Sequence, residues 1–115
     1  MGTNGEFNIE VSEDGAEIAV VSVAGEIDID NAHSLRSVVS VAAGWNETSR
    51  VVVDLSAVTL MDSSGISALL LCHRDCQASG IGFEAVGAQG GPLKVLELTG
   101  VLELLSARPA DELNA

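Results

Sequence analysis

The sequence predicts a single α/β domain in which three to four helices pack on a mixed, mostly parallel β-sheet of four to five strands. Its 115 residues suit one compact domain, and a hydrophobic fraction of 47% is sufficient for a folded core. After an initial pair of strand-like segments, strand-like and helix-like patterns alternate, which is typical of parallel sheets covered by helices. Because only 3% of the residues are aromatic and none is tyrosine, the core must consist mainly of aliphatic side chains.

The first two predicted strands form a hairpin. Residues 7–11 alternate between apolar and polar side chains, which is the pattern of a half-buried strand. Residues 13–15, Glu-Asp-Gly, provide a turn. Residues 18–23 then form a second and more continuously apolar strand.

A helix is predicted to begin near Ala32. Asp28, Asp30 and Asn31 precede it and offer side chains that can cap its amino terminus. Gly44 stands where a glycine commonly ends a helix. The apolar residues that share one face are Ala32, Leu35, Val39 and Ala42.

A buried strand and a second helix follow. The β-branched run at residues 51–55 is typical of a central strand covered on both faces. Asp-Ser-Ser-Gly at residues 62–65 opens the helix, and Gly80 ends it. The inward face of this helix is predicted at Ile66, Leu69, Leu70, His73 and Cys76.

The last third of the chain adds a strand at residues 81–86 and a helix over residues 93–98, with Pro92 at its first position and Gly100 at its end. Residues 101–105 are predicted to form a final edge strand. The expected order is therefore β-β-α-β-α-β-α-β. With only three helices, one face of the sheet is expected to be thinly covered.

Residues 1–115 are predicted to form one domain, with a core from about residue 6 to 105 and loose termini at 1–5 and 106–115. No run approaches the roughly 20 apolar residues that a membrane-spanning helix needs, and the first residues lack the basic and apolar regions of a signal peptide. Cys72 and Cys76 do not make a disulfide framework. The expected location is the cytoplasm.

The formal net charge of −12 narrows the choice of partner. Such a surface repels nucleic-acid phosphates and offers no basic stripe that could release counterions. An anionic membrane is disfavoured for the same reason. The composition therefore predicts a protein partner with a basic or mixed-charge docking face.

The most informative segment is residues 51–65, in which a buried strand leads through Asp62 into a helix. Ser63 and Ser64 fall in or beside the first helical turn, where free backbone N–H groups and the helix dipole favour negative charge. A phosphoserine is well accommodated there, and Gly65 would leave room for an approaching partner backbone. Ordinary helix capping, with a purely structural role, is the competing interpretation.

Catalytic and metal-binding interpretations find little support in the sequence, and no cofactor is expected. His33 and His73 do not suggest a Ser-His-Asp arrangement with Ser63. Cys72 and Cys76, one helical turn apart, are expected to be packed free thiols, with a redox switch as the alternative. Two sulfurs are too few for a closed zinc site.

A glycine-rich segment and the single tryptophan are the remaining features of note. The glycine-rich residues 87–91 lack both the Lys-Ser/Thr of a P-loop and the glycine spacing of a dinucleotide site, so a plain loop is expected. Trp45 either anchors the end of the first helix or presents an aromatic side chain to a partner.

Three segments resemble motifs of one known family, in the same order and with similar spacing. Asp-Leu-Ser at 54–56 with Met-Asp-Ser-Ser-Gly at 61–65 is similar to the signature of the STAS domain family, in particular its anti-sigma factor antagonists of the SpoIIAA and RsbV type. Gly-Glu-Ile-Asp at 25–28 resembles the family's Gly-Glu-(Leu/Ile)-Asp element, and residues 95–101 resemble its late helix-to-strand segment. The resemblance covers residues 7–105.

This resemblance implies partner switching rather than catalysis. In the family, the unphosphorylated antagonist binds an anti-sigma factor that is also a serine kinase, and this frees the sigma factor. The kinase phosphorylates the serine after the motif's aspartate, and a serine phosphatase reverses the step. Carried over, the acceptor is Ser63, with Ser64 as the second candidate, while Asp62 and Gly65 belong to the docking surface and Asp28 contributes to docking or phosphorylation.

Two other functions stay open at this point. One is a STAS subunit of a lipid-transport assembly that binds its partner without phosphorylation. The other, a small hydrolase using Ser63, lacks a positioned base. The family's antagonists commonly end in a longer amphipathic helix than the segment after residue 106, which Pro109 interrupts.

Overall fold

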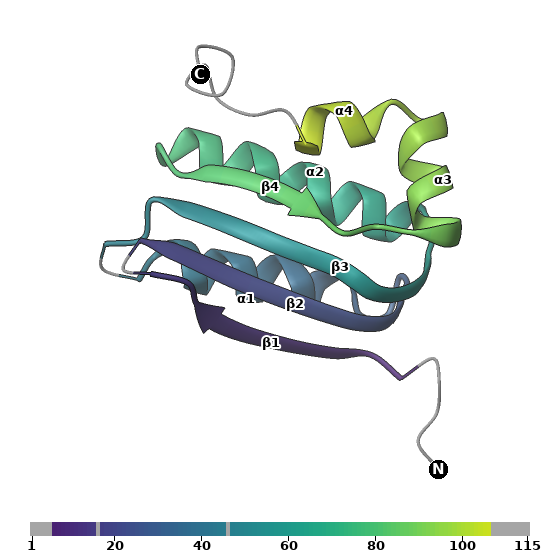
Figure 1. Ribbon diagram of the computed structural model, residues 1–115, viewed down its shortest axis with the longest axis horizontal. Helices are drawn as coiled ribbons and strands as arrows, with labels where there is room; N and C mark the ends of the chain where they lie inside the picture. The colour runs from purple at the N-terminus through teal and green to yellow at the C-terminus, as the bar shows by residue number, and fades with distance from the viewer. Residues whose placement is uncertain (1–5, 16, 46, 107–115) are drawn as a thin grey trace.

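The structure is a computed structural model that describes residues 6–15, 17–45 and 47–106. Eight elements follow one another in this part of the chain (Figure 1). In order they are β1 (Asn8–Glu13), β2 (Ile18–Ile27), α1 (Ala32–Ala43), β3 (Arg50–Met61), α2 (Ser63–Ala78), β4 (Gly82–Val86), α3 (Gly90–Leu98) and α4 (Val101–Ser106). The predicted loose termini lie outside the described residues except for Ser106, which ends α4.

Within the described residues the sheet has four strands in the order β1-β2-β3-β4. β1 and β2 pair antiparallel, which confirms the predicted hairpin. β2 and β3 pair parallel, as do β3 and β4, with Val53 of the central β3 strand facing Val21 on one side and Ala85 on the other. The prediction of a mixed, mostly parallel sheet is therefore confirmed.

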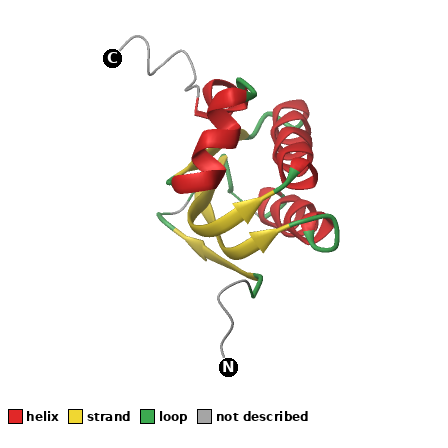
Figure 2. Ribbon diagram, turned by 90° about the vertical axis from the view of Figure 1, so that its right-hand side faces the viewer, coloured by secondary structure: helices red, strands yellow, loops and turns green. Residues whose placement is uncertain are grey.

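The helices divide the two faces of the sheet unequally. α1 and α2 lie side by side on one face, while α3 and α4 gather around the β4 edge (Figures 1 and 2). Alternate residues of each strand face α1 and α2 and are buried. They are Ala19, Val21, Val23 and Ile27 of β2, Val51, Val53 and Leu55 of β3, and Phe83 and Ala85 of β4. In β4, Glu84 of the opposite face is buried as well. On the opposite face Ser22 is exposed and Val52 only half-buried, so this face is thinly covered.

The predicted edge strand at residues 101–105 is wrong, because this segment forms the helix α4. Gly100 adopts a left-handed φ of 79° after α3 and turns the chain back toward the sheet. Leu105 is then fully buried, and Leu102 lines a cleft beside Val86 of β4. A short apolar run does not distinguish a strand from a buried helix, and leucine and glutamate favour the helix.

The inward face of α2 also differs from its prediction. Leu69 and Cys76 are buried as expected, but Ile66, Leu70 and His73 are only half-buried. The fully covered stripe instead includes Gly65, Ala68 and Cys72. The reason is that α2 packs against α1 as well as β4, so the side with the most neighbours is turned toward α1. The ring of His73 meets that of Phe83 edge-on, with centroids 6.2 Å apart.

Three helix ends show which glycine predictions hold. Gly80 and Gly100 both have left-handed φ angles, 75° and 79°, as expected of residues that end helices. Gly44 is helical at φ −90°, and the left-handed residue of that loop is Glu47 at φ 70°.

Pro92 is the third residue of α3, whereas the sequence predicts it as the first. It still lies within the first turn, whose N–H groups have no partner inside the helix.

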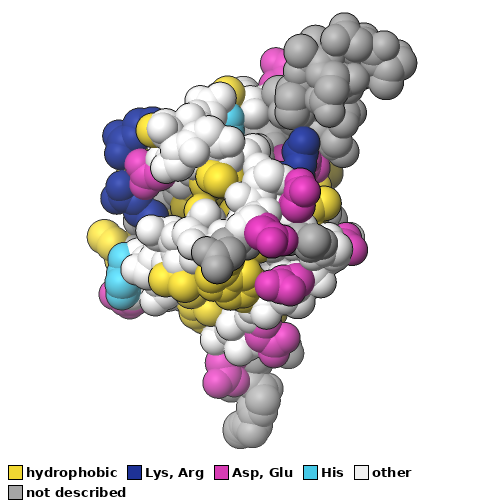
Figure 3. Space-filling view, turned by 90° about the vertical axis from the view of Figure 1, so that its left-hand side faces the viewer, with side chains coloured by type: hydrophobic (Ala, Val, Ile, Leu, Met, Phe, Trp, Pro, Cys, Tyr) yellow, Lys and Arg dark blue, Asp and Glu magenta, His cyan; other side chains and the backbone are white. Residues whose placement is uncertain are grey.

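Charge is distributed unevenly over the molecule. Figure 3 shows basic side chains clustered at one side of the end that carries the helix carboxyl termini, and acidic side chains in a row along the other side. α1 and α2 contain Arg36 and Arg74 but only one carboxylate, Asp75, of the chain's 17 acidic residues. The acidic residues of the described chain therefore lie mostly in the strands, the loops and the helices α3 and α4. Among the described helices, none is long and apolar enough to cross a lipid bilayer.

Candidate functional site

The candidate site lies where the parallel strands β2 and β3 end. Ile27 and Met61, their last residues, are register partners, and the backbone N–H of Asp62 donates a hydrogen bond to the carbonyl oxygen of Ile27 over 3.2 Å. The loop that follows β2 and the helix start that follows β3 are thus fixed next to each other. Carboxyl ends of parallel strands are a common place for binding sites.

Asp62 caps α2, as the sequence predicts. Its backbone is extended, and its Oδ1 atom accepts hydrogen bonds from the N–H groups of Ser64 at 2.8 Å and Gly65 at 3.3 Å. This satisfies two N–H groups that the helix itself leaves without a partner. Ser63 is the first residue of the helix and is exposed, whereas Ser64 is half-buried. The cap therefore presents the Ser63 hydroxyl to solvent at the positive end of the helix dipole.

Gly65 serves the core. It is buried, and a Cβ atom at this position would stand 2.5 Å from Cγ of Met61 and 2.9 Å from Cγ2 of Ile27. Its missing side chain therefore faces the ends of β2 and β3, not an approaching partner as the sequence analysis expected. The glycine allows the first turn of α2 to lie directly on the sheet.

Asp28 belongs to a tightly bonded loop between β2 and α1. Its Oδ1 atom accepts a hydrogen bond from the N–H of Asp30 at 3.0 Å, and its backbone N–H donates to Oδ1 of Asn31 at 2.9 Å. Asn31 also donates from Nδ2 to the carbonyl oxygen of Glu26 at 2.9 Å. Asn31 occupies the N-cap position of α1, but its side chain makes no capping bond and instead fixes the loop that carries Asp28.

A cavity of about 370 Å³ opens between the amino-terminal halves of α1 and α2. Ser63, Ser64 and Ser67 line it from α2, and His33 and Arg36 line it from α1. Two exposed apolar side chains on or near its rim were not predicted from the sequence. Ile29, on the rim, is 76% exposed, and Leu60, two residues before Asp62, is 55% exposed.

The exposed apolar side chains have a signal in the sequence. Ile29 stands between two aspartates in a loop, and Leu60 follows Thr59 near the end of a strand. Large apolar side chains that stay exposed beside a candidate site are typical of protein-binding surfaces. Arg36 carries no comparable signal, because only the packing of α1 against α2 brings it to the serines.

His33 shares the cavity with Ser63, a proximity that their separation in sequence did not suggest. Within the described ranges no hydrogen bond joins them, and His73 packs against Phe83 instead. In the same part of the chain, no three His, Cys, Asp or Glu side chains converge on a point that could hold a metal ion.

The cysteines and the tryptophan belong to the core. Cys72 and Cys76 are buried free thiols, and desolvation by burial raises the pKa of Cys72 to about 12 and that of Cys76 to about 11. Thiols with such pKa values stay protonated and unreactive at neutral pH. Trp45 is half-buried and packs against the core at the end of α1, so it is an anchor rather than an exposed aromatic side chain.

The comparison with known families identifies the family of this domain. The model of the STAS domain matches residues 8–113, which is nearly the whole chain. The protein belongs to the STAS domain family.

Solved STAS domains of similar fold come from more than one biological setting. An anti-sigma factor antagonist from Mycobacterium paratuberculosis is 24% identical, with a TM-score of 0.78 over 99% of this chain and 97% of that one. The anti-sigma factor antagonist SpoIIAA in its unphosphorylated form is 18% identical, with a TM-score of 0.72 over 93% of this chain and 94% of that one. A sulfate transporter family protein from Wolinella succinogenes is 20% identical, with a TM-score of 0.65 over 77% of this chain and 71% of that one. At these identities the likeness establishes the fold alone.

Proposed function

We propose that this STAS domain is a bacterial anti-sigma factor antagonist that switches partners through phosphorylation of Ser63. Unphosphorylated, it binds an anti-sigma factor with serine kinase activity and thereby releases the sigma factor for transcription. The kinase then phosphorylates Ser63 and dissociates from the antagonist, and a serine phosphatase restores the form that binds. The protein works in the cytoplasm as a ligand and substrate, not as an enzyme.

The observation that carries this proposal is the exposed position of Ser63 at the start of a capped helix. Asp62 already satisfies the N–H groups of Ser64 and Gly65, so the helix cap does not need the exposed Ser63 hydroxyl. A phosphate there meets the positive end of the α2 dipole and is tolerated by the folded domain. Phosphorylation can therefore change the surface without changing the fold.

The surroundings of Ser63 explain why a phosphate would end binding. Ile29 and Leu60 offer exposed apolar area near this end of α2, and Asp28 and Asp30 add negative charge next to it. A partner that covers the apolar area and pairs with the aspartates must remove water from Ser63. A dianion at that place introduces a desolvation cost and repels the nearby carboxylates. A loss of about 3 kcal/mol lowers affinity roughly a hundredfold.

The test compares three baits in lysate of the source cell, namely the unmodified protein, Ser63→Ala and Ser63→Glu. We expect the first two to capture an ATP-binding anti-sigma kinase, identified by mass spectrometry, and Ser63→Glu to lose it. The captured kinase should then transfer phosphate from ATP to the unmodified protein and not to Ser63→Ala. The melting temperature of Ser63→Glu should stay close to that of the unmodified protein, since Ser63 is exposed.

A second function, a STAS subunit of a lipid-transport or other regulatory assembly, is supported by the likeness to a transporter family protein. This function predicts that all three baits capture the same transporter components. That result, or kinase capture unaffected by Ser63→Glu, would reject the switch at Ser63.

A further inference from the structure

We propose that a phosphate on Ser63 is held within the same molecule by Arg36, which leaves Asp75 and turns into the cavity between α1 and α2. This inference rests on the proposed phosphorylation of Ser63 and adds the residue that receives the phosphate. It makes α1, and not only α2, part of the switch.

The first observation is the composition of the cavity. Arg36 and His33 line it opposite Ser63, Ser64 and Ser67, and none of its described lining residues is acidic. This is unusual in a chain with 17 acidic and five basic residues. The acceptor serine and Arg36 thus line one open cavity of about 370 Å³.

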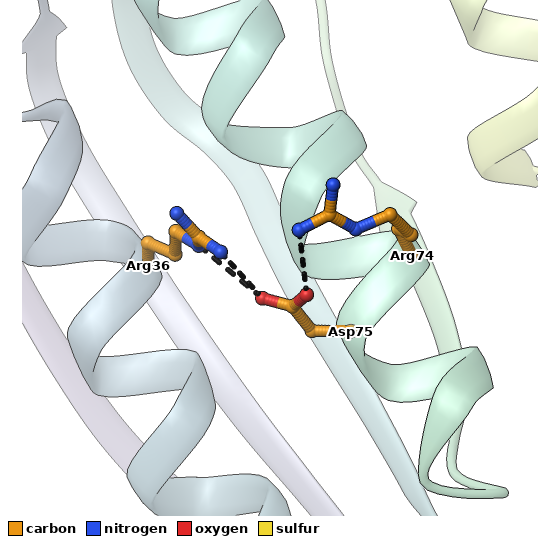
Figure 4. A network of polar contacts seen from close by, with 3 residues as sticks. All are labelled: Arg36, Arg74 and Asp75. Carbon is orange, nitrogen blue, oxygen red and sulfur yellow. Dashed lines mark hydrogen bonds and ion pairs between the residues drawn. The ribbon is translucent and has the colours of Figure 1, made fainter.

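The second observation is how Arg36 is held now. Its Nε and Nη2 atoms donate hydrogen bonds to Oδ2 of Asp75 at 3.2 and 3.0 Å, while Nη2 of Arg74 donates to Oδ1 of the same carboxylate at 3.2 Å (Figure 4). The side chains of Arg36 and Asp75 are 44% and 45% exposed, so their ion pair is worth little in water. If Arg36 leaves, Asp75 keeps Arg74 as its partner.

The third observation is the position of Arg36 between the cavity and Asp75. Ser63 and Ser67, one turn apart on α2, line the cavity, and Asp75 lies about two turns after Ser67. Arg36 lines the same cavity and also pairs with Asp75. A rotation of the Arg36 side chain about its own bonds turns the guanidinium from Asp75 toward the serines.

A phosphate competes well for this arginine. It carries about two negative charges and three acceptor oxygens, and a guanidinium can bind two of them at once. The other charged groups near this end are Asp62, whose Oδ1 atom bonds the α2 backbone, and Asp28 and Asp30 in the neighbouring loop. His33 adds a second donor. The clamped phosphate would occupy part of the cavity, and with it part of the surface available to a partner.

The experiment installs phosphoserine at position 63 during protein synthesis and follows its ³¹P chemical shift as a function of pH at low salt. In the otherwise unmodified protein, the second phosphate pKa should lie below the value of about 6 typical of phosphoserine. Arg36→Gln should raise it by about half a unit or more, because a nearby positive charge favours the dianion. Arg74→Gln is the matched control, since Arg74 also binds Asp75 but does not line the cavity, and it should leave the pKa unchanged.

Identical titrations of the unmodified protein and Arg36→Gln would overturn the proposal. If Arg36→Gln does not fold, Asp75→Asn tests the same exchange from the other side. Freeing Arg36 from the carboxylate should then lower the phosphate pKa further, and an unchanged pKa would contradict the clamp. Because no kinase is needed, failure of this test is distinct from failure of the proposed function, which the kinase capture decides.

Discussion

Three residues at the start of α2 have separate tasks. Asp62 accepts two backbone hydrogen bonds, Ser63 is exposed, and Gly65 packs on Met61 and Ile27. The exposed hydroxyl therefore lies between two residues that the fold requires, the helix cap Asp62 and the closely packed Gly65. Because both neighbours serve the fold, a modification of Ser63 acts on a rigid surface.

Gly65 gives a prediction at this scale. Gly65→Ala should lower the free energy of unfolding by about 1–3 kcal/mol, because the new Cβ overlaps Met61 and Ile27. Gly91→Ala is the matched control, since Gly91 also lies in the first turn of a helix and its Cβ meets nothing within 4 Å. Urea unfolding measures both. A Gly65→Ala variant as stable as the control would show that α2 can move off the sheet at no cost.

α1 and α2 illustrate how two elements determine the properties of side chains between them. Cys72 and Cys76 lie on successive turns of α2, and both line a cavity against Val39 and Ala43 of α1. Burial in this interface raises both thiol pKa values, with the nearby Cys76 adding to the effect on Cys72. The same contact brings Arg36 to Asp75 and to the cavity beside Ser63.

The buried thiols predict how stability depends on pH. An unfolded cysteine ionises near pH 8.5, whereas the folded pKa values are about 12 and about 11. The folded state therefore binds more protons above pH 8.5, and the free energy of unfolding must fall as pH rises from there toward 11–12. The loss should reach up to about 2 kcal/mol per thiol at pH 10. No tyrosine obscures this range.

Urea unfolding between pH 7 and 10.5 measures this effect, and the double variant Cys72→Ala, Cys76→Ala is its control. The variant is expected to be less stable at every pH, since it loses packed sulfur atoms, but its stability should change much less above pH 8.5. A pH dependence equal to that of the unmodified protein would mean that the thiols are accessible in the folded state.

At the scale of the whole molecule, the net charge of −12 is concentrated away from the α1–α2 pair. Carboxylates that crowd the strands, the loops and the helices α3 and α4 repel one another more strongly in the compact state than in the extended chain. This arrangement also leaves a less negative helical face near Ser63, flanked by the aspartates of the β2–α1 loop.

Salt should therefore stabilise the protein. Raising NaCl from 10 to 300 mM shortens the screening length several-fold and should raise the melting temperature at pH 7. The single ion pair between α1 and α2 is too exposed to reverse this trend. A melting temperature that falls with NaCl would indicate that attractive pairs outweigh the repulsion.

The sequence by itself determined the sheet, the first three helices and the position of Ser63, because these depend on local signals. Apolar alternation located the strands, and Asp62 marked the helix start by side-chain chemistry that needs no distant partner. The family resemblance in residues 25–28 and 54–65 rested on the same local segments, and the match over residues 8–113 confirms the family.

Only the tertiary structure decided the roles that depend on contacts between distant segments. Residues 101–105 became a helix because Leu105 finds a buried position beside β4, and Gly65 is required by Met61 and Ile27 rather than by a partner. Arg36 reaches the cavity of Ser63 only because α1 and α2 lie side by side on one sheet face. A periodic pattern states which side of an element is apolar, but the neighbours that this side meets are set by packing the whole chain.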